Sequence, residues 1–236
     1  MPPIGGPDVI LPQYKKTVTD TAVTDVMTEL AALADPKALA INQRHGDDHA
    51  VNLGALRAIA KKIKTDQELA VRLWRTGDSA ARLVALLICR PKAFTSDDLD
   101  RMLHEPQSPK VRDWLVNYVV KKSPHAEELR VAWMAESHSA GWGLTVDRIA
   151  KKPEGLDLDK LLDTIEAEMK DAPKDLQWAM NHCLAQIGIS HAEHRKRALD
   201  IGERLAVLKD YPTSPGCTSP YAPIWISEMV RRQEGD

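Results

Sequence analysis

The sequence predicts an all-α fold, an α-solenoid of about six helical pairs stacked one on the next. Three observations predict it. Apolar residues recur at three- and four-residue spacing along most of the 236 residues, alternating β-type runs bounded by turns are absent, and a basic motif returns every thirty residues. A helical pair of that length buries its apolar face only against a neighbour, so the pairs are expected to stack. The alternative is an irregular helical bundle.

The repeat is marked by basic residues that follow an apolar pair. With Pro91 counted in register, these basic sites begin at positions 61, 91, 121 and 151. A helix-start signal follows each of them, at Thr65-Asp66, Ser96-Asp97, Ser123-Pro124 and Pro153-Glu154. A first helix then runs to a turn, and a second helix returns to the next basic site. This order is typical of HEAT-like repeats.

The two ends of the chain differ from this pattern. Residues 1–19 are expected to form a flexible leader, because their first twelve positions hold four prolines and two glycines. Residues 20–236 are expected to form a single HEAT-like repeat domain, which opens with a pair of helices at 20–34 and 52–64. The repeat weakens after residue 155, and the remaining helices are predicted at 157–170, 174–187, 192–208 and 222–233.

Composition excludes several classes of protein. Lys and Arg number 32 against 34 Asp and Glu, a net charge of −2, so binding to nucleic acid requires charge segregated onto one face. No apolar run approaches the ~18 residues of a membrane span, and no signal peptide follows Met1. Three widely spaced cysteines without a CxxC pair indicate a reducing compartment. We therefore expect a cytoplasmic monomer with no membrane contact.

Motifs for cofactors and for covalent catalysis are missing from the sequence. It contains no phosphate-binding loop, no GxSxG elbow, no HExxH and no GxGxxG. His191 and His194 stand at metal-ligand spacing but lack supporting ligands. We expect neither a metal nor a cofactor.

Lysines form the clearest candidate for a ligand-binding row. Lys61, Lys121 and Lys151 recur at the repeat spacing, with Lys92 and Lys152 close to the row. Cations at a regular spacing on a concave face suit a polyphosphate backbone, and Lys121, Lys151 and Lys152 are predicted to contact phosphates. The alternative is that they stabilise helix C-termini, where cations offset the macrodipole. The two roles are compatible.

Tryptophans are unusually frequent, at 6 against 1 Phe. Trp74 and Trp133 lie on predicted first helices and are expected to be core residues. Trp114, Trp142 and Trp178 lie near the starts of second helices, where packing and a stacking platform for bases remain equal alternatives.

Several blocks of the sequence resemble one family, the DNA alkylation repair family typified by AlkD. They are NLGALRAIAKKI (52–63), WRTGDSAARLVALLI (74–88), VRDWLVNYVVKK (111–122), QWAMNHCLAQIG (177–188) and GCTSPYAPIWISEMVRR (216–232). The resemblance implies a HEAT-like solenoid whose concave basic face holds double-stranded DNA with alkylated bases. Active members of the family are glycosylases that release cationic N3- and N7-alkylated purines. His182 lies in the same block as Trp178 and is included among the candidate DNA-binding residues.

The catalytic pattern of that family is altered here. The family has a Trp followed four residues later by an Asp, with an Arg from the next repeat. Asp113 and Asn117 stand at the first two of these positions, Trp114 comes one position late, and the region 139–142 holds no Arg. Asp113 and Asp147 are the candidate replacement acids.

Three functions follow from this pattern. They are an alkylpurine glycosylase that uses Asp113, a non-catalytic relative that recognises damaged, bent or branched DNA, and a HEAT-type scaffold that binds other proteins.

Overall fold

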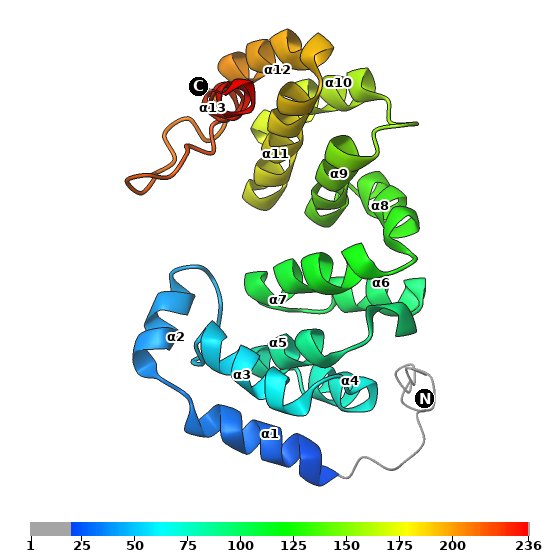
Figure 1. Cartoon of the computed structure of the whole chain (residues 1–236), viewed down its shortest axis with the longest axis vertical. Helices are drawn as coiled ribbons and strands as arrows, with labels where there is room; N and C mark the ends of the chain where they lie inside the picture. The colour runs from blue at the N-terminus through cyan, green and yellow to red at the C-terminus, as the bar shows by residue number, and fades with distance from the viewer. Residues whose placement is uncertain (1–19, 236) are drawn as a thin grey trace, which may run out of the picture. The chain divides into compact units, whose positions relative to one another are not determined.

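The computed structural model describes residues 20–235, and within that range every regular element is helical (Figure 1). Thirteen α-helices are joined by short connections, with no strand among the described residues, so the predicted all-α fold is confirmed. The leader predicted at 1–19 lies outside this range. The chain forms two compact units, one ending at His125 and one beginning at Ala126, and each is described by itself.

The first unit contains seven α-helices. They are α1 (Asp20–Ala32), α2 (Pro36–Gln43), α3 (Leu53–Ile63), α4 (Gln67–Arg75), α5 (Ser79–Ile88), α6 (Ser96–His104) and α7 (Pro109–Trp114). Side chains of Asp66 and Thr95 cap α4 and α6, at or next to predicted start signals, and the side chain of Asp78 caps α5. One expectation was wrong: α1 packs against α4 and α5, whereas α3 packs against α5, so α1 and α3 are not the opening pair.

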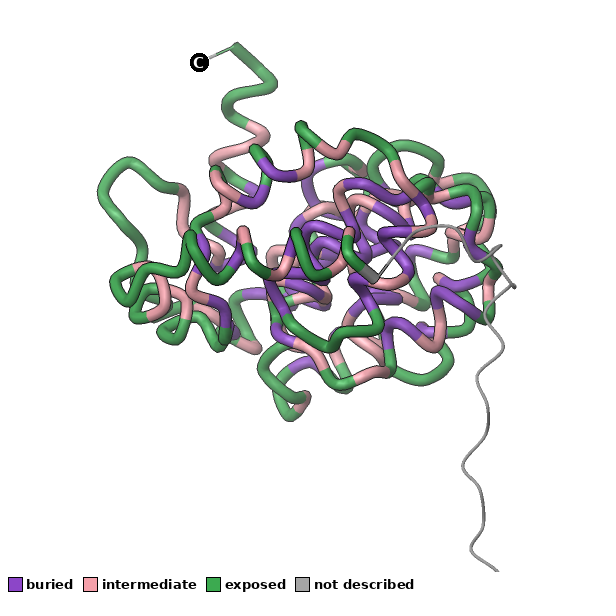
Figure 2. Tube along the Cα trace, turned by 90° about the horizontal axis from the view of Figure 1, so that it is seen from below, coloured by how far each residue is buried: buried purple, intermediate pink, exposed green. Residues whose placement is uncertain are grey.

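Helix α5 forms the centre of the first unit. Nine of its ten residues are buried, and it packs against α3, α4 and α7. An apolar helix that is covered on all sides is typical of an inner position, whereas the outer helices α4 and α6 are strongly amphipathic. Figure 2 shows the resulting pattern, in which buried and exposed residues alternate along most of the helices. Helical spacing of apolar residues in the sequence predicts that Leu86, Val116, Val119 and Ile149 are buried, and the structure confirms this.

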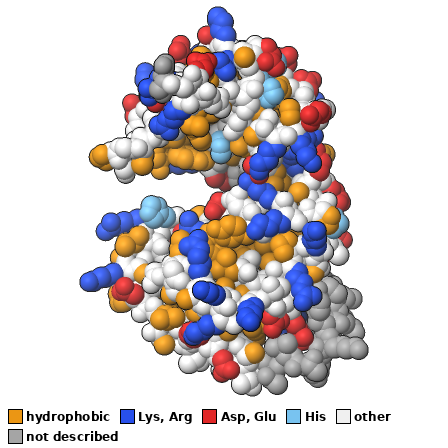
Figure 3. All heavy atoms as spheres, viewed as in Figure 1, with side chains coloured by type: hydrophobic (Ala, Val, Ile, Leu, Met, Phe, Trp, Pro, Cys, Tyr) orange, Lys and Arg blue, Asp and Glu red, His pale blue; other side chains and the backbone are white. Residues whose placement is uncertain are grey.

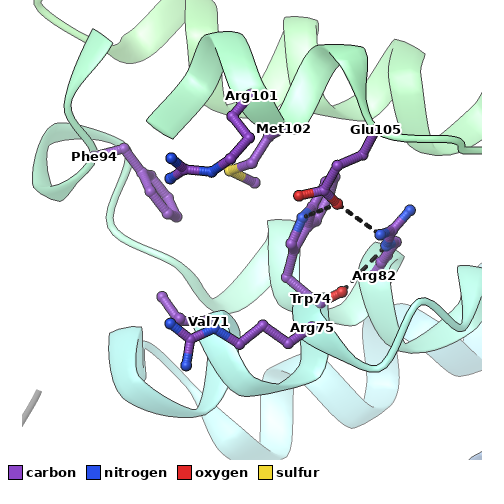
Figure 4. Close-up of a pocket in the computed structure, with 8 residues that line it drawn as sticks. All are labelled: Val71, Trp74, Arg75, Arg82, Phe94, Arg101, Met102 and Glu105. Carbon is purple, nitrogen blue, oxygen red and sulfur yellow. Dashed lines mark hydrogen bonds and ion pairs between the residues drawn. The ribbon is translucent and has the colours of Figure 1, made fainter. Parts of the chain in front are cut away.

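A buried arginine joins three helices of this unit (Figure 4). Arg82 on α5 is 7% exposed, and its guanidinium donates to the backbone oxygens of Trp74 (3.1 Å) and Pro106 (2.7 Å). It also forms an ion pair with Glu105 at 2.7 Å, and the Trp74 indole donates to the same carboxylate oxygen at 2.9 Å. This network borders a cavity of about 320 Å³ between α4 and α6. The burial predicted for Trp74 is confirmed.

The second unit contains six α-helices. They are α8 (Ala126–Ala135), α9 (Ser139–Lys151), α10 (Leu158–Glu168), α11 (Lys174–Ser190), α12 (Ala192–Leu205) and α13 (Ala222–Glu234). Helix α11 packs against α9, α10, α12 and α13, so it forms the centre of this unit. Helix α10 is capped by the side chain of Asp157 and confirms the helix predicted at 157–170 within two residues at each end.

Close approach between helices of the second unit depends on glycine. A Cβ atom on Gly141 of α9 would lie 2.5 Å from the backbone nitrogen of Met134 in α8, so only glycine permits this contact. Trp133 and Ile149 of this unit are buried, as predicted. Among the described residues, no helix is both long enough and apolar enough to cross a membrane.

Candidate nucleic-acid interface

The candidate site of the first unit begins at an irregular turn that follows α7. Residues Leu115–Val119 form a π-helical turn, and Val120–Lys122 form a 3₁₀ turn after it. A π turn contains one residue more than an α-helical loop, so side chains beyond it lose the α-helical register. The four-residue spacing of Asp113, Asn117 and Lys121 predicts that they share one helical face, and the π turn corrects this prediction for Lys121. Turns of this kind occur frequently at functional sites.

Asp113 and Asn117 do meet, as their four-residue spacing predicted. The Asn117 amide nitrogen donates to the Asp113 carboxylate at 2.8 Å and to its backbone oxygen at 3.0 Å. The Asp113 side chain is exposed and Asn117 is half-buried. The position at which the resemblance places an acid thus holds a neutral amide, and its donor group is already engaged by Asp113.

Next to this pair, two cations lie over two aromatic rings. The Arg57 guanidinium, from α3, lies 5.2 Å from the centre of the Trp114 ring, and the Lys122 ammonium lies 5.7 Å from that of Tyr118. The two rings contact each other at 5.1 Å with a tilt of 56°. We call these four residues the cation–aromatic ladder. Contact with a ring restricts a long side chain while leaving its charge available.

Burial decides between the alternatives for two of the tryptophans. Trp114 is 4% exposed and Trp142 is 2% exposed, so neither indole offers an open face for a base. Trp142 lies in the core of the second unit, and its backbone oxygen accepts from the Cys183 thiol at 3.2 Å. Of the two alternatives, burial therefore favours packing over base stacking for Trp114 and Trp142, and neither is retained as a candidate DNA-binding residue.

The predicted lysines lie at helix ends. Lys121 is half-buried in the 3₁₀ turn of the first unit, whereas Lys151 and Lys152 are exposed at the end of α9 in the second. Lys151 lies 3.9 Å from the carboxylate of Asp147, the second candidate acid. The Lys152 backbone oxygen accepts a hydrogen bond from Arg148. Their contact with phosphate stays a prediction, and a role at helix C-termini fits the same positions.

Charge is divided unequally between the two units. Residues 20–125 carry 16 Lys and Arg against 14 Asp and Glu, whereas residues 126–236 carry 14 against 19. Figure 3 shows many Lys and Arg side chains on the viewed face of the first unit, around an area of hydrophobic side chains. The first unit is therefore the better match for a polyanion.

In the second unit, Trp178 and His182 lie one helical turn apart on α11 beside other aromatic rings. Trp178 is 40% exposed, and its ring lies 5.1 Å from that of Tyr211. The His182 ring stacks on Trp225 of α13, with centres 4.8 Å apart and planes 26° apart. These aromatic side chains thus form a cluster that the sequence predicted only in part.

Sequence reasoning missed five of the aromatic and basic residues at these sites, namely Arg57, Tyr118, Lys122, Tyr211 and Trp225. A usable signal existed for Tyr118 and Lys122, which continue the four-residue spacing that starts at Trp114. Arg57 meets Trp114 across 57 positions of the chain, which no local pattern indicates.

Comparison with known proteins supports the fold and identifies the family. A model of the DNA alkylation repair enzyme family matches residues 26–226. Two uncharacterized proteins, Lmo0209 of Listeria monocytogenes and Lin0241 of Listeria innocua, are 21% and 22% identical to this chain, over 87% of it and 96% of each relative.

A solved structure superposes on the chain with a TM-score of 0.69 and 27% identity, covering 89% of this chain and 94% of the other. It represents a new family of proteins related to the HEAT-like repeat DNA glycosylases, with affinity for branched DNA structures. The described helices thus have the fold of a HEAT-like repeat protein related to those glycosylases. With a family match that spans most of its length, this chain belongs to the DNA alkylation repair enzyme family.

Proposed function

We propose that the protein binds branched or otherwise distorted double-stranded DNA and does not excise alkylated bases. The observation that carries the proposal is the amide of Asn117, whose nitrogen is hydrogen-bonded to Asp113 at the position where the family resemblance places an acid. Loss of a cationic base leaves positive charge on the sugar, and a nearby carboxylate is what stabilises it. An amide supplies no such charge. The 27% identical relative with affinity for branched DNA supports the binding part of the proposal.

The cation–aromatic ladder is the proposed contact with the DNA backbone. Arg57 is exposed on α3 and Lys122 is exposed after the π turn, and each cation is held over a ring. Cations that are already ordered lose less side-chain entropy on meeting a phosphate. Each phosphate neutralised releases counterions, so the logarithm of the affinity falls with the logarithm of the salt concentration by about 0.9 per contact.

The test compares DNA shapes and charge variants by fluorescence anisotropy. A four-way junction and a linear duplex of equal length are titrated over a salt series, and the junction is expected to bind more tightly. Arg57→Ala with Lys122→Ala is expected to reduce the salt slope by about 1.8, or about 0.9 for each lost contact. The control is Lys196→Ala with Arg204→Ala. It also removes two positive charges, both from α12, where they form ion pairs with Asp200 and Glu166, and it is expected to leave the slope unchanged.

Two outcomes would contradict this proposal. Equal affinity for the junction and the duplex would remove the preference for branched DNA. If neither the junction nor the duplex binds in a salt-dependent way, the protein-binding scaffold is favoured instead.

Excision by Asp113 is the second candidate function. Its carboxylate is exposed on the same helical segment as Asn117, 2.8 Å from the amide, so it could approach a sugar. Duplex DNA that carries N7-methylguanine is incubated with the protein, and abasic sites are counted. Release above the spontaneous rate would overturn the non-catalytic proposal, and Asp113→Asn would then be expected to reduce the rate by about 10²-fold. If Asp113→Asn left the rate unchanged, Asp147 would be the next acid to replace.

A further inference from the structure

A second cavity, in the C-terminal unit, has the chemistry of a base-binding pocket. It has a volume of about 290 Å³ and lies between α11, α13 and the connection that precedes α13. Three aromatic side chains line it, from Trp178, Tyr211 and Trp225. Hydroxyl groups line it as well, from Thr213, Ser214, Thr218 and Ser219. Most small-molecule pockets combine an apolar lining with a few polar groups in this way.

The aromatic rings of this pocket are held in place but remain accessible. Trp178 and Tyr211 are 40% and 49% exposed, and their rings pack edge to face with centres 5.1 Å apart and planes at 64°. The Trp225 ring is fixed by stacking against His182. Large exposed rings that are already ordered offer stacking area at low entropic cost.

A cation stands at the edge of this pocket. Arg232, on α13, donates to the Thr218 hydroxyl at 3.2 Å while its side chain is 55% exposed. It also lies 3.9 Å from the carboxylate of Glu228, which pairs more closely with Arg231 at 2.8 Å, so the Arg232–Glu228 pair is loose. A planar aromatic ligand that carries a phosphate would match rings inside the pocket and a guanidinium at its edge.

We propose that the pocket formed by Trp178, Tyr211 and Trp225 binds one unpaired nucleobase, with Arg232 contacting the adjoining phosphate. This inference rests on the proposed function, because branched DNA is the source of the unpaired base. Branch points and frayed arms expose bases, whereas a continuous duplex keeps its bases stacked. Stacking accounts for affinity without sequence preference, since every base has a π face. The hydroxyl groups around the rings can hydrogen-bond to the edge of any base.

Cys217 provides a reporter inside the pocket. It lines the cavity and is exposed, whereas Cys89 and Cys183 are buried. Burial raises the pKa of the Cys89 thiol to about 12 and raises that of Cys183 still further. A thiol reagent at neutral pH therefore modifies Cys217 selectively in the folded protein.

The experiment measures the rate of Cys217 modification with four DNA ligands at saturating concentration. They are a short oligo-dT strand, a junction with one single-stranded arm, a fully paired four-way junction and a blunt linear duplex. The oligo-dT strand and the armed junction are expected to slow modification at least fivefold, and the blunt duplex is expected to have no effect. Protection by the fully paired junction as well would indicate that the base comes from the branch point rather than from the arm.

Variants separate base stacking from general DNA binding. Trp178→Ala is expected to abolish the protection and to weaken oligo-dT binding about tenfold, whereas Trp178→Phe, which keeps a ring, retains most of both. Ile224→Ala is the matched control, because Ile224 is an exposed hydrophobic residue on α13 that does not line the cavity.

Each result decides the question. Equal protection by the blunt duplex, or no protection by oligo-dT and the armed junction, would overturn the pocket proposal even if junction binding by the first unit is intact. Protection by oligo-dT without any preference for junctions would support the pocket while contradicting the proposed function.

Discussion

Replacing Arg82 with methionine is expected to destabilise the first unit strongly, because this buried guanidinium joins α4, α5 and α6. The substitution keeps an unbranched apolar stem but leaves the backbone oxygens of Trp74 and Pro106 without this donor, at about 1 kcal/mol each. Loss of the ion pair with Glu105, which is 31% exposed, is expected to cost about 1 kcal/mol. Loss of the cation over the Trp74 ring adds about 0.5–1 kcal/mol. The expected decrease in the free energy of unfolding is therefore about 3.5–4 kcal/mol.

Urea unfolding followed by tryptophan fluorescence and circular dichroism measures this decrease. If the two units unfold in separate transitions, only the midpoint of the first unit is expected to move. Arg75→Met is the control, because Arg75 lines the same cavity but is exposed, and its loss is expected to change stability by less than about 0.5 kcal/mol. A decrease below 1 kcal/mol for Arg82→Met would refute the view that the buried guanidinium holds the three helices together.

Three further predictions concern binding, chemistry and packing. Replacing Lys121 and Lys151 together is expected to weaken duplex binding and to reduce the salt slope by about 0.9 per lost contact. Unchanged anisotropy curves would indicate that both lysines only stabilise helix C-termini. Asn117→Asp, which supplies the family's acid, is expected to raise abasic-site formation on N7-methylguanine DNA. Asp113→Asn is expected to leave duplex affinity unchanged, because it removes no attraction for phosphate. Gly141→Ala is expected to lower the free energy of unfolding by about 1–3 kcal/mol in a urea titration, since its Cβ would lie 2.5 Å from a backbone nitrogen of α8; a neutral effect would mean that the two helices can separate freely.

Much of the fold could be predicted because helical periodicity and capping are local properties. The ends of α3, α11 and α13 fall within three residues of the predicted bounds, and the buried side chains of Val119 and Ile149 were identified from spacing alone. Helix α2 escaped prediction because it buries none of its residues and thus has no apolar stripe. The side chain of Asp35 caps the start of α2, but a capping residue predicts a helix only when an apolar stripe follows it in the sequence.

The sites were less predictable because they depend on contacts between distant residues. The burial of Trp142 and the exposure of Trp178 follow from which helices cover each one, although both indoles lie near the start of a helix. The pairing of Arg57 with Trp114 likewise requires α3 and the end of α7 to lie close together. Asp113 and Asn117 were placed together correctly, since their contact depends on one helical turn.

The π turn at Leu115–Val119 also affects how this segment can be aligned with its relatives. A π turn accommodates one additional residue without adding the full rise per residue of an α-helix. A relative with a regular α-helix here would therefore span the same distance with one residue fewer. Counting positions through the segment then pairs residues that point in different directions on one side of the turn. Residues that follow the turn, from Val120 onward, are therefore better matched to those of relatives by superposing the turns than by sequence position.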